Sequence, residues 1–327
     1  MEKPWHDYRS FLLERYGESV YRIAIDGGFG CPNQARCIYC DSLGSSSAYQ
    51  RVQERGFAYR GELVEEIDSL VEPIKLQTME ERIDSISHQV SRGASFIDRR
   101  YPGCAKSIYF QAFTNTNDKT ENLKKLYDKA LSMGDYKELI VSTRPDVLSD
   151  EVLDLLCTYT SQVEEVWVEL GLQSGSDATL KAIKRGHSVD DYLDACRRAK
   201  ARGLKVTAHI ILGLPNEGPA EYLQTAALLT SSPIDGLKIH HLQVLCGSEL
   251  ANLYRAGKVK APTFQEHLEG VILILRHIPQ NIVIQRLMSE APPHRLIAPR
   301  DFGNKSVFLR ALEEEMRRRS VSQGDAL

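Results

Sequence analysis

The sequence lacks the features that define several large classes of protein. It has no run of about 18 apolar residues, the length that a membrane-spanning helix requires, and no early apolar segment typical of a signal peptide. It contains neither a Gly-x-Gly-x-x-Gly pattern nor a P-loop, so the usual nucleotide-binding turns are absent. The formal net charge of −3 gives no overall excess of basic residues, although it is compatible with a local basic groove. These absences favour a cytoplasmic protein without a membrane segment.

Cysteine is the residue whose distribution is informative. The chain of 327 residues has seven cysteines, and three of them, Cys31, Cys37 and Cys40, lie within ten residues. A structural zinc site is normally closed by four protein ligands, and an iron–sulfur cube is normally held by four cysteines. Three thiolates with no fourth ligand nearby therefore predict a metal centre with one open position. A zinc site with a remote fourth ligand and an incidental grouping are the alternatives. The scattered cysteines are expected to be buried as small apolar side chains: Cys104, Cys157, Cys196 and Cys246.

The order of apolar and amphipathic segments predicts an α/β fold. Amphipathic segments alternate with strand-like segments, and such alternation is typical of parallel strands connected by helices. We expect six strand–helix units in a partial (β/α)6 barrel, similar to a TIM barrel. The predicted strands are residues 21–26, 107–113, 138–142, 165–170, 205–212 and 236–245, and the helices between them are 121–131, 149–158, 189–201 and 219–229.

The predicted barrel occupies residues 21–248, with smaller segments on both sides. Residues 1–20 form a lead-in that is expected to be helical. Residues 249–319 form a small C-terminal α+β extension, with helices at 264–277 and 305–319 and a strand at 282–287. Residues 42–56 are predicted to be a loop, and residues 62–90 to be helical with an interruption near Pro73. The tail, residues 320–327, is expected to be disordered.

Polar or glycine-containing motifs follow nearly every predicted strand. The cysteines follow the first strand, and the last strand carries His240, His241 and Gln243. The second to fifth predicted strands are followed by the motifs TNTN (114–117), STRPD (142–146), GLQSG (171–175) and GLP (213–215). The carboxyl ends of parallel strands lie at one rim of a barrel, where the working residues of barrel enzymes are found. We therefore predict one shared pocket at this rim.

The cysteine triplet resembles the signature of the radical S-adenosylmethionine (SAM) superfamily, in which three cysteines follow the first barrel strand. The two residues between Cys37 and Cys40 match that signature, whereas five residues instead of three separate Cys31 from Cys37. Further motifs resemble the YhcC-like branch of the superfamily, which is related to the catalytic subunit of Elongator and to methylthiotransferases. These motifs are FQAFTNTN, STRPD, ELGLQSGSDATLKAIKRGH, LGLP and VIQRL, so the resemblance extends over residues 4–310.

This resemblance implies an enzyme with two cofactors. A [4Fe-4S] cluster would be bound by Cys31, Cys37 and Cys40, and its fourth iron would be bound by the amino and carboxylate groups of SAM. One electron, delivered by a donor such as a flavodoxin or ferredoxin, would cleave SAM reductively to a 5′-deoxyadenosyl radical that acts on a substrate. The cofactors carry the difficult chemistry, while the protein positions them and excludes water.

The resemblance also implies SAM-binding roles for particular residues. Gln173 and Arg185 resemble positions that hold the ribose or the methionine part of SAM, with a surface arginine as the alternative for Arg185. Asn115 and Thr116 resemble the position that binds the amino group. Tyr39 would offer backbone contacts to the adenine, with simple packing as the alternative. The remaining residues of the predicted SAM site are Gln111, Ser142, Gly213 and Pro215, of which the last two would shape the backbone beside the adenine.

Three further residues are candidates for the pocket. Arg144 is placed to contact the ribose or the substrate, and His209, near the end of the fifth strand, is placed to contact the substrate. We predict these two residues as catalytic, with a core histidine as the alternative for His209. Glu169 is predicted to be a pocket acid that contacts the cofactor, or else the structural partner of an arginine.

The substrate is predicted from the resemblance alone. It is the side chain of a wobble uridine, so tRNA is a candidate partner. A basic cluster around one predicted helix would contact RNA phosphates or form a solvated face, and residues 317–319 have the same two interpretations. A radical SAM enzyme acting on a small metabolite or a peptide, and a non-catalytic iron–sulfur redox protein, are the other hypotheses. The basic cluster consists of Lys181, Lys184, Arg185, Arg197, Arg198, Lys200, Arg202 and Lys205.

Overall fold

The computed structural model describes residues 3–33, 36–40, 78–111, 113–291 and 293–327. The predicted loop at 42–56 and residues 62–77 of the predicted helical segment at 62–90 lie outside these ranges. Among the helices within them, none is both long and apolar enough to cross a membrane.

One sheet of seven parallel strands forms the centre of the described chain, in the order β1-β2-β3-β4-β5-β6-β8. Because neighbouring strands are parallel, each connection must cross back over the outside of the sheet. This is the predicted α/β partial barrel with one strand more than expected, since β8 comes from the C-terminal extension and pairs with β6. The strands are β1 (Val20–Ile25), β2 (Ala105–Phe110), β3 (Glu138–Thr143), β4 (Glu165–Gln173), β5 (Lys205–Leu212), β6 (Gly236–His241) and β8 (Val283–Arg286).

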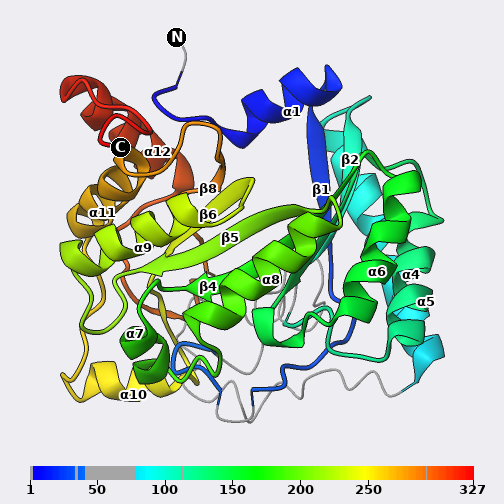
Figure 1. Cartoon of the computed structure of the whole chain (residues 1–327), viewed down its shortest axis with the longest axis horizontal. Helices are drawn as coiled ribbons and strands as arrows, with labels where there is room; N and C mark the ends of the chain where they lie inside the picture. Colours follow the sequence, from blue (N-terminus) through cyan, green and yellow to red (C-terminus); the bar gives the residue numbers. More distant parts are fainter. Residues whose placement is uncertain (1–2, 34–35, 41–77, 112, 292) are drawn as a thin grey trace.

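Helices surround the sheet, with α4, α5 and α6 near one edge and α9, α11 and α12 near the other (Figure 1). Several begin at a side chain that caps the helix: Ser149, Ser188 and Thr263 each accept a hydrogen bond from a backbone amide of the first turn. The helices are α1 (Tyr8–Tyr16), α4 (Met79–Arg100), α5 (Thr120–Leu131), α6 (Asp150–Thr158), α7 (Asp177–Ala182), α8 (Val189–Ala201), α9 (Pro219–Ser231), α10 (Glu249–Arg255), α11 (Phe264–Arg276) and α12 (Lys305–Arg318).

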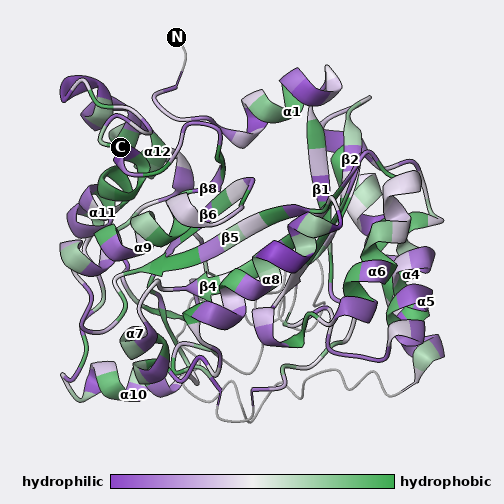
Figure 2. Cartoon of the chain, in the orientation of Figure 1, coloured by the Kyte–Doolittle hydropathy of each residue, from purple (hydrophilic) through white to green (hydrophobic). Residues whose placement is uncertain are grey.

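The apolar core lies between the sheet and these helices. All nine residues of β4 are buried, as expected for a central parallel strand that is covered on both faces. Figure 2 shows hydrophilic residues on the outward side of α8, opposite the core. Gly93 lets α4 approach β1 closely, because a Cβ at this position would lie 2.7 Å from Cγ2 of Ile23. This contact fixes α4 against the strand that carries the cysteine loop.

The concave side of the sheet is polar. Lys238 of β6 forms an ion pair with Glu169 of β4 and donates a hydrogen bond of 3.1 Å to the hydroxyl of Tyr109 on β2. Tyr109 in turn donates to Glu169 at 3.0 Å. Since β2, β4 and β6 are not neighbours in the sheet, these contacts require the sheet to curl around them. At the opposite end from the cysteines, Tyr8 of α1 donates to Glu138 at 2.6 Å and helps to close the barrel.

The C-terminal segments are joined to the barrel. Strand β7 (Val244–Leu245) pairs with β9 (Leu296–Ala298), so a boundary at residue 248 would separate paired strands. The prediction of a disordered tail is wrong. Gln323 is only 2% exposed, its backbone amide donates to Pro4 at 2.9 Å, and its side chain donates to Pro279 at 2.6 Å. A buried amide that bridges two distant segments orders the end of the chain.

Candidate active site

The three clustered cysteines lie on the loop that follows β1. Cys31 is exposed, Cys37 is buried and Cys40 is partly buried, and the seven cysteines, all within the described ranges, form no disulfide bond. The amide of Cys40 donates to the carbonyl of Cys37 at 2.9 Å, which forms a tight turn. Ile38 inside this turn donates to the carbonyl of Ile183 at 3.1 Å. The cysteine loop is therefore anchored to the segment that follows α7.

Two side chains that the sequence analysis did not connect with the cysteines contact Cys37. Nδ2 of Asn33 lies 3.5 Å from Sγ of Cys37, and Nη1 of Arg185 lies 3.8 Å from the same sulfur. Burial, together with the nearby thiols of Cys37 and Cys31, raises the pKa of Cys40 to about 11.

The structure does not gather these thiols around one point. In the described ranges, no group of three His, Cys, Asp or Glu side chains is arranged to hold a metal ion. That geometry applies to a single ion. In an iron–sulfur cube each cysteine binds a different iron at a different corner, so the three sulfurs need not meet. The donor set of three cysteines on one loop therefore remains suitable for a cluster.

Three residues at the ends of other strands have buried polar atoms without a hydrogen-bond partner in the described part of the chain. These atoms are Oδ1 of Asn115, Nη1 of Arg144 and Oε1 of Gln173. The three side chains are 0%, 3% and 6% exposed, so the missing partners carry a free-energy cost unless a ligand supplies them. Gln173 also has a positive φ of 76°, a strained conformation for a residue with a side chain. All three positions were predicted to bind SAM.

Gly171 makes room for the side chains beside it. A Cβ at this position would lie 2.5 Å from Nη2 of Arg185 and 2.6 Å from Nε2 of Gln173. The Gly171 carbonyl accepts a hydrogen bond of 2.7 Å from Arg185, whose Nε donates to His187 at 2.9 Å. Burial and the Arg185 charge lower the pKa of His187 to about 4, so this imidazole is a neutral acceptor. Each nitrogen of Arg185 thus has a protein partner, including Cys37.

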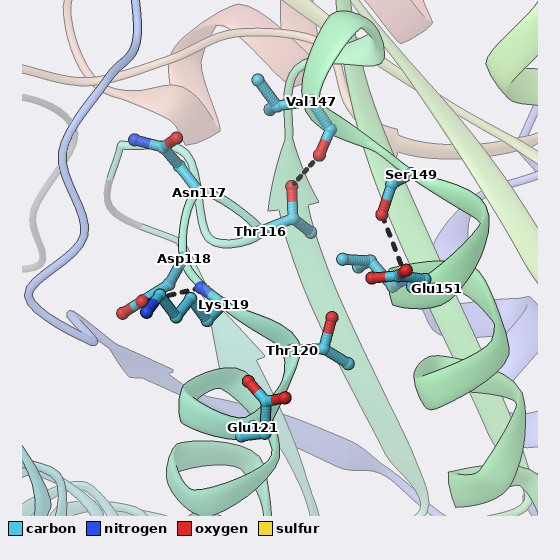
Figure 3. A pocket seen from close by; sticks show the side chains of 10 residues that line it. Thr116, Asn117, Asp118, Lys119, Thr120, Glu121, Val147, Ser149 and Glu151 are labelled. Carbon is cyan, nitrogen blue, oxygen red and sulfur yellow. Dashed lines mark hydrogen bonds between the residues drawn. The ribbon is translucent and has the colours of Figure 1, made fainter.

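Two predicted cofactor contacts are not supported by the structure. Glu169 lies in the buried ion pair with Lys238, and its other oxygen accepts from Tyr109, so it is the structural partner of a lysine rather than of an arginine. The hydroxyl of Thr116 is 2.5 Å from that of Thr143 and donates to the carbonyl of Val147 at 3.1 Å. Figure 3 shows Thr116 lining a surface hollow between the starts of α5 and α6. The side chain of Thr116 thus links the segment that follows β2 to the end of β3.

The other predicted residues have varied surroundings. The amide of Gln111 donates to the carbonyl of Ile25 at 3.1 Å, and the Ser142 carbonyl accepts two hydrogen bonds from Asn115. Burial raises the pKa of Tyr39 well above its ordinary value, and the Arg185 charge opposes this change.

Gly213 and Pro215 lie on the segment that follows β5. Gly213 has a φ of +85°, and a Cβ there would lie 2.8 Å from Pro262, so only glycine suits this position. His209 lies farther inside the barrel, with its ring centroid 4.1 Å from that of His240.

The predicted basic cluster is largely neutralised by acidic residues. Arg198 pairs with Asp194 at 2.6 Å and with Asp150 at 3.3 Å, and Lys200 pairs with Asp235 at 2.8 Å. The three C-terminal arginines, residues 317–319, also form ion pairs with glutamates. Such paired charges match the alternative of a solvated face rather than a surface that attracts RNA phosphates.

The curled sheet, the cysteine loop behind β1 and the polar strand ends define a radical SAM enzyme. Family models agree: one described as Radical SAM superfamily matches residues 97–229, and one described as Radical_SAM C-terminal domain matches residues 234–318. Protein YhcC of Escherichia coli K12 is 33% identical over 322 residues, which cover 97% of this chain and 93% of that protein. The chain therefore belongs to the YhcC family of the radical SAM superfamily. Membership implies a [4Fe-4S] cluster, SAM and a reductant.

More distant similarities concern part of the chain or the fold alone. The tRNA uridine(34) acetyltransferase of Methanocaldococcus infernus is 29% identical over 157 residues, which cover 47% of this chain and 29% of that protein. The structure of Elp3 from the same archaeon, with its N-terminus (1–46) deleted, has a TM-score of 0.64 at 20% identity and covers 73% of this chain and 60% of that one. The second similarity supports the architecture of the barrel.

Proposed function

We propose that Cys31, Cys37 and Cys40 hold a [4Fe-4S] cluster and that SAM binds beside it at the carboxyl ends of the strands. When bound, the two cofactors supply a reductive cleavage of SAM to a 5′-deoxyadenosyl radical, for which a flavodoxin or ferredoxin would deliver the electron. The observation that carries the proposal is the set of unpartnered buried atoms of Asn115 and Gln173 at the carboxyl ends of strands, together with three thiols on the loop that follows β1.

Each unpartnered atom suits a different group of SAM. Oδ1 of Asn115 and Oε1 of Gln173 are acceptors, so they suit the ammonium group and a ribose hydroxyl. Nη1 of Arg144 is a donor, and its charge suits the carboxylate or an oxygen of the substrate. The Nε and Nη2 atoms of Arg144 each donate to Asp146 at 2.9 Å, which fixes the direction of the guanidinium. We assign His209, deeper in the barrel, to substrate contact.

The contacts at Cys37 support a role in stabilising the cluster loop. Asn33 also donates to the carbonyl of Lys184 at 2.8 Å, so one side chain joins the cysteine loop to the segment that carries Arg185. Hydrogen bonds to a cluster ligand stabilise the reduced, more negative cluster and thereby tune its potential. Asn33 and Arg185 would therefore act as positioning residues for Cys37.

For the substrate, we propose the side chain of a wobble uridine in tRNA. The proposal is supported by the similarity to the archaeal tRNA uridine(34) acetyltransferase, which matches this chain over only part of its length. The ion-paired surface of α8 gives it no support. A small metabolite or a peptide is the second candidate, favoured by the paired basic surface.

The test of the cofactor proposal is the iron and acid-labile sulfide content of anaerobically reconstituted protein, together with EPR of the reduced form. Single Cys31→Ala, Cys37→Ala and Cys40→Ala variants are expected to lose the cluster, while Cys104→Ala, outside the loop, should keep it. Zinc without iron in the wild type would overturn the proposal, as would a cluster that survives all three substitutions. Formation of 5′-deoxyadenosine from SAM tests the activity.

The tRNA proposal needs a separate measurement. Nucleoside mass spectrometry of tRNA from a strain lacking the gene is expected to show a changed wobble-uridine profile, which the wild-type gene should restore and the Cys37→Ala gene should not. An unchanged profile would reject tRNA as the substrate while leaving the cofactor proposal intact.

A further inference from the structure

A second polar cluster lies inside the barrel, away from the strand-end residues assigned to SAM. We call His209, His240 and Arg286 the lumen cluster. His209 of β5 is in register with Lys238 of β6, which is in register with Arg286 of β8. The ring centroids of the two histidines are 4.1 Å apart, and Nη1 of Arg286 lies 3.1 Å from Nε2 of His240. Three adjacent strands therefore bring these groups together.

The lumen cluster is the accessible layer of the polar interior. His209, His240 and Arg286 are half-buried, whereas Lys238, two positions before His240 on the same strand, is 1% exposed. The carboxyl rim is the end toward which β6 runs from Lys238 to His240. A molecule that enters from this rim would therefore meet His240 before it reaches the ion pair of Lys238 and Glu169, while His209 and Arg286 are in register with Lys238.

Within the part of the chain that the structure describes, no carboxylate forms an ion pair with Arg286. Among the described residues, the side chain of Arg286 donates a hydrogen bond to His240. No described carboxylate oxygen lies within 4.0 Å of a nitrogen of the Arg286 guanidinium, the limit for an ion pair. Lys238, by contrast, has Glu169 as its partner. A guanidinium that is partly removed from water without a counter-charge raises the free energy of the folded chain.

Both imidazoles of the cluster are neutral. A guanidinium nitrogen can only donate, so Nε2 of His240 accepts and does not carry a proton. Burial, together with the charges of Lys238 and Arg286, lowers the pKa of His209 to about 3 despite the nearby Glu169. The cluster thus combines one uncompensated positive charge with two neutral rings. Nε2 of His209 also has no hydrogen-bond partner in the described part of the chain.

We propose that the lumen cluster binds an oxyanion of the substrate, a carboxylate or a phosphate group, with Arg286 as its principal ligand. The planar guanidinium offers two parallel donors to such a group, and this geometry makes arginine the preferred partner of carboxylates and phosphates. Nε2 of His209 supplies another polar contact. Asn115 follows β2 and Gln173 is the last residue of β4, whereas Arg286 is the last residue of β8, at the far edge of the sheet. The anion would therefore bind on the side of the barrel opposite the SAM site. The inference rests on the proposed function for its definition of that site.

The test is anion-dependent thermal unfolding of the whole chain, before and after cluster reconstitution. Inorganic phosphate and acetate serve as probes, each compared with sodium chloride at equal ionic strength. Saturable stabilisation is expected for the wild type. Arg286→Gln should weaken the apparent affinity by about tenfold or more, because a charge-assisted pair of hydrogen bonds is lost. Arg300→Gln, which removes an exposed arginine outside the strands of the sheet, is the control and should respond like the wild type.

Two further readouts keep the inference falsifiable. Without an anion, Arg286→Gln should unfold at the same or a higher temperature, because an uncompensated charge is removed; a structural arginine would lower it. Arg286→Lys, which keeps the positive charge but lacks the two parallel donors of the guanidinium, should retain part of the response to anions. Equal responses of wild type and Arg286→Gln, or no response of the wild type, would overturn the proposal. The relative strength of phosphate and acetate distinguishes a phosphate ester from a carboxylate. Because the effect is measured without the cluster as well, failure of the SAM proposal is seen separately.

Discussion

Lys238→Met would remove the ammonium that balances Glu169 inside the barrel. The two residues are 1% and 3% exposed, so the carboxylate would stay buried and lose its counter-charge. Although burial opposes ionisation, the ammonium group of Lys238 holds the pKa of Glu169 at about 2, against an ordinary value of 4.5. This difference is worth roughly 3 kcal/mol. Breaking a buried pair generally costs about 3–5 kcal/mol, and we expect that decrease in the free energy of unfolding.

The pH dependence has a defined sign. The pKa of Glu169 is lower in the folded than in the unfolded chain, so its ionisation stabilises the fold above the ordinary pKa. That contribution is lost as the pH falls from about 4 toward the folded pKa of about 2. In Lys238→Met, burial without the ammonium raises the pKa of Glu169. The difference between wild type and variant should therefore be largest at neutral pH and shrink in acid.

Urea unfolding followed by circular dichroism measures these changes. Lys184→Met is the matched control, because the Lys184–Glu249 pair is 45% and 44% exposed and should contribute less than about 1 kcal/mol. Adding Glu169→Gln to Lys238→Met removes the unpaired charge and should restore part of the stability. A double variant no more stable than Lys238→Met, or a loss as small as in the control, would refute the reasoning.

Three further substitutions test other contacts. Gly93→Ala should lower the free energy of thermal unfolding by about 1–3 kcal/mol despite the better helix propensity of alanine, because its Cβ would lie 2.7 Å from Cγ2 of Ile23; a stabilised variant would contradict this packing. Gln323→Ala should cost about 1–3 kcal/mol in urea unfolding, since two buried carbonyls lose a donor, and an unchanged midpoint would mean that the tail does not pack. Arg198→Ala should change tRNA affinity in filter binding by less than about twofold, because aspartates already neutralise it; a large loss would make α8 an RNA-binding surface.

The elements that the sequence predicted well have a strong pattern of their own. The range 205–212 was predicted with the same bounds as β5, and 189–201 with those of α8, since each has an uninterrupted periodicity and clear ends. The membership of β8 in the main sheet was not predicted, because its pairing with β6, in which Gly236 lies opposite Val283, depends on tertiary contacts. The order of residues 320–327 was not predicted for the same reason, because it depends on hydrogen bonds from Gln323 to the carbonyls of Pro279 and Ile282.

The site shows a similar division. The strand-end rule placed Asn115, Arg144 and Gln173 at the rim, because parallel strands bring their carboxyl ends together whatever the details of packing. Asn33 and His187 were missed, although Cys37 and Arg185 lie only four and two residues from them. Their roles depend on long-range contacts, Arg185 with Cys37 and Asn33 with Lys184, which span 148 and 151 residues of chain. Lys238 could have been found, because Lys238 and His240 are two positions apart in β6 and therefore lie on one face of the sheet, which indicates that this face is polar.

Strand β8 has a consequence for any attempt to divide the molecule. The two regions matched by family models meet between residues 229 and 234, which suggests a convenient place to cut. A fragment that ended there would lack β6 and β8 and leave one border of β5 with bare amides and carbonyls, and one that ended between β6 and residue 283 would do the same to β6. Such a border recruits other chains and drives self-association. Because β8 comes from the C-terminal segment and forms the last strand of the sheet, the barrel strands and the C-terminal segment should be expressed together as one chain.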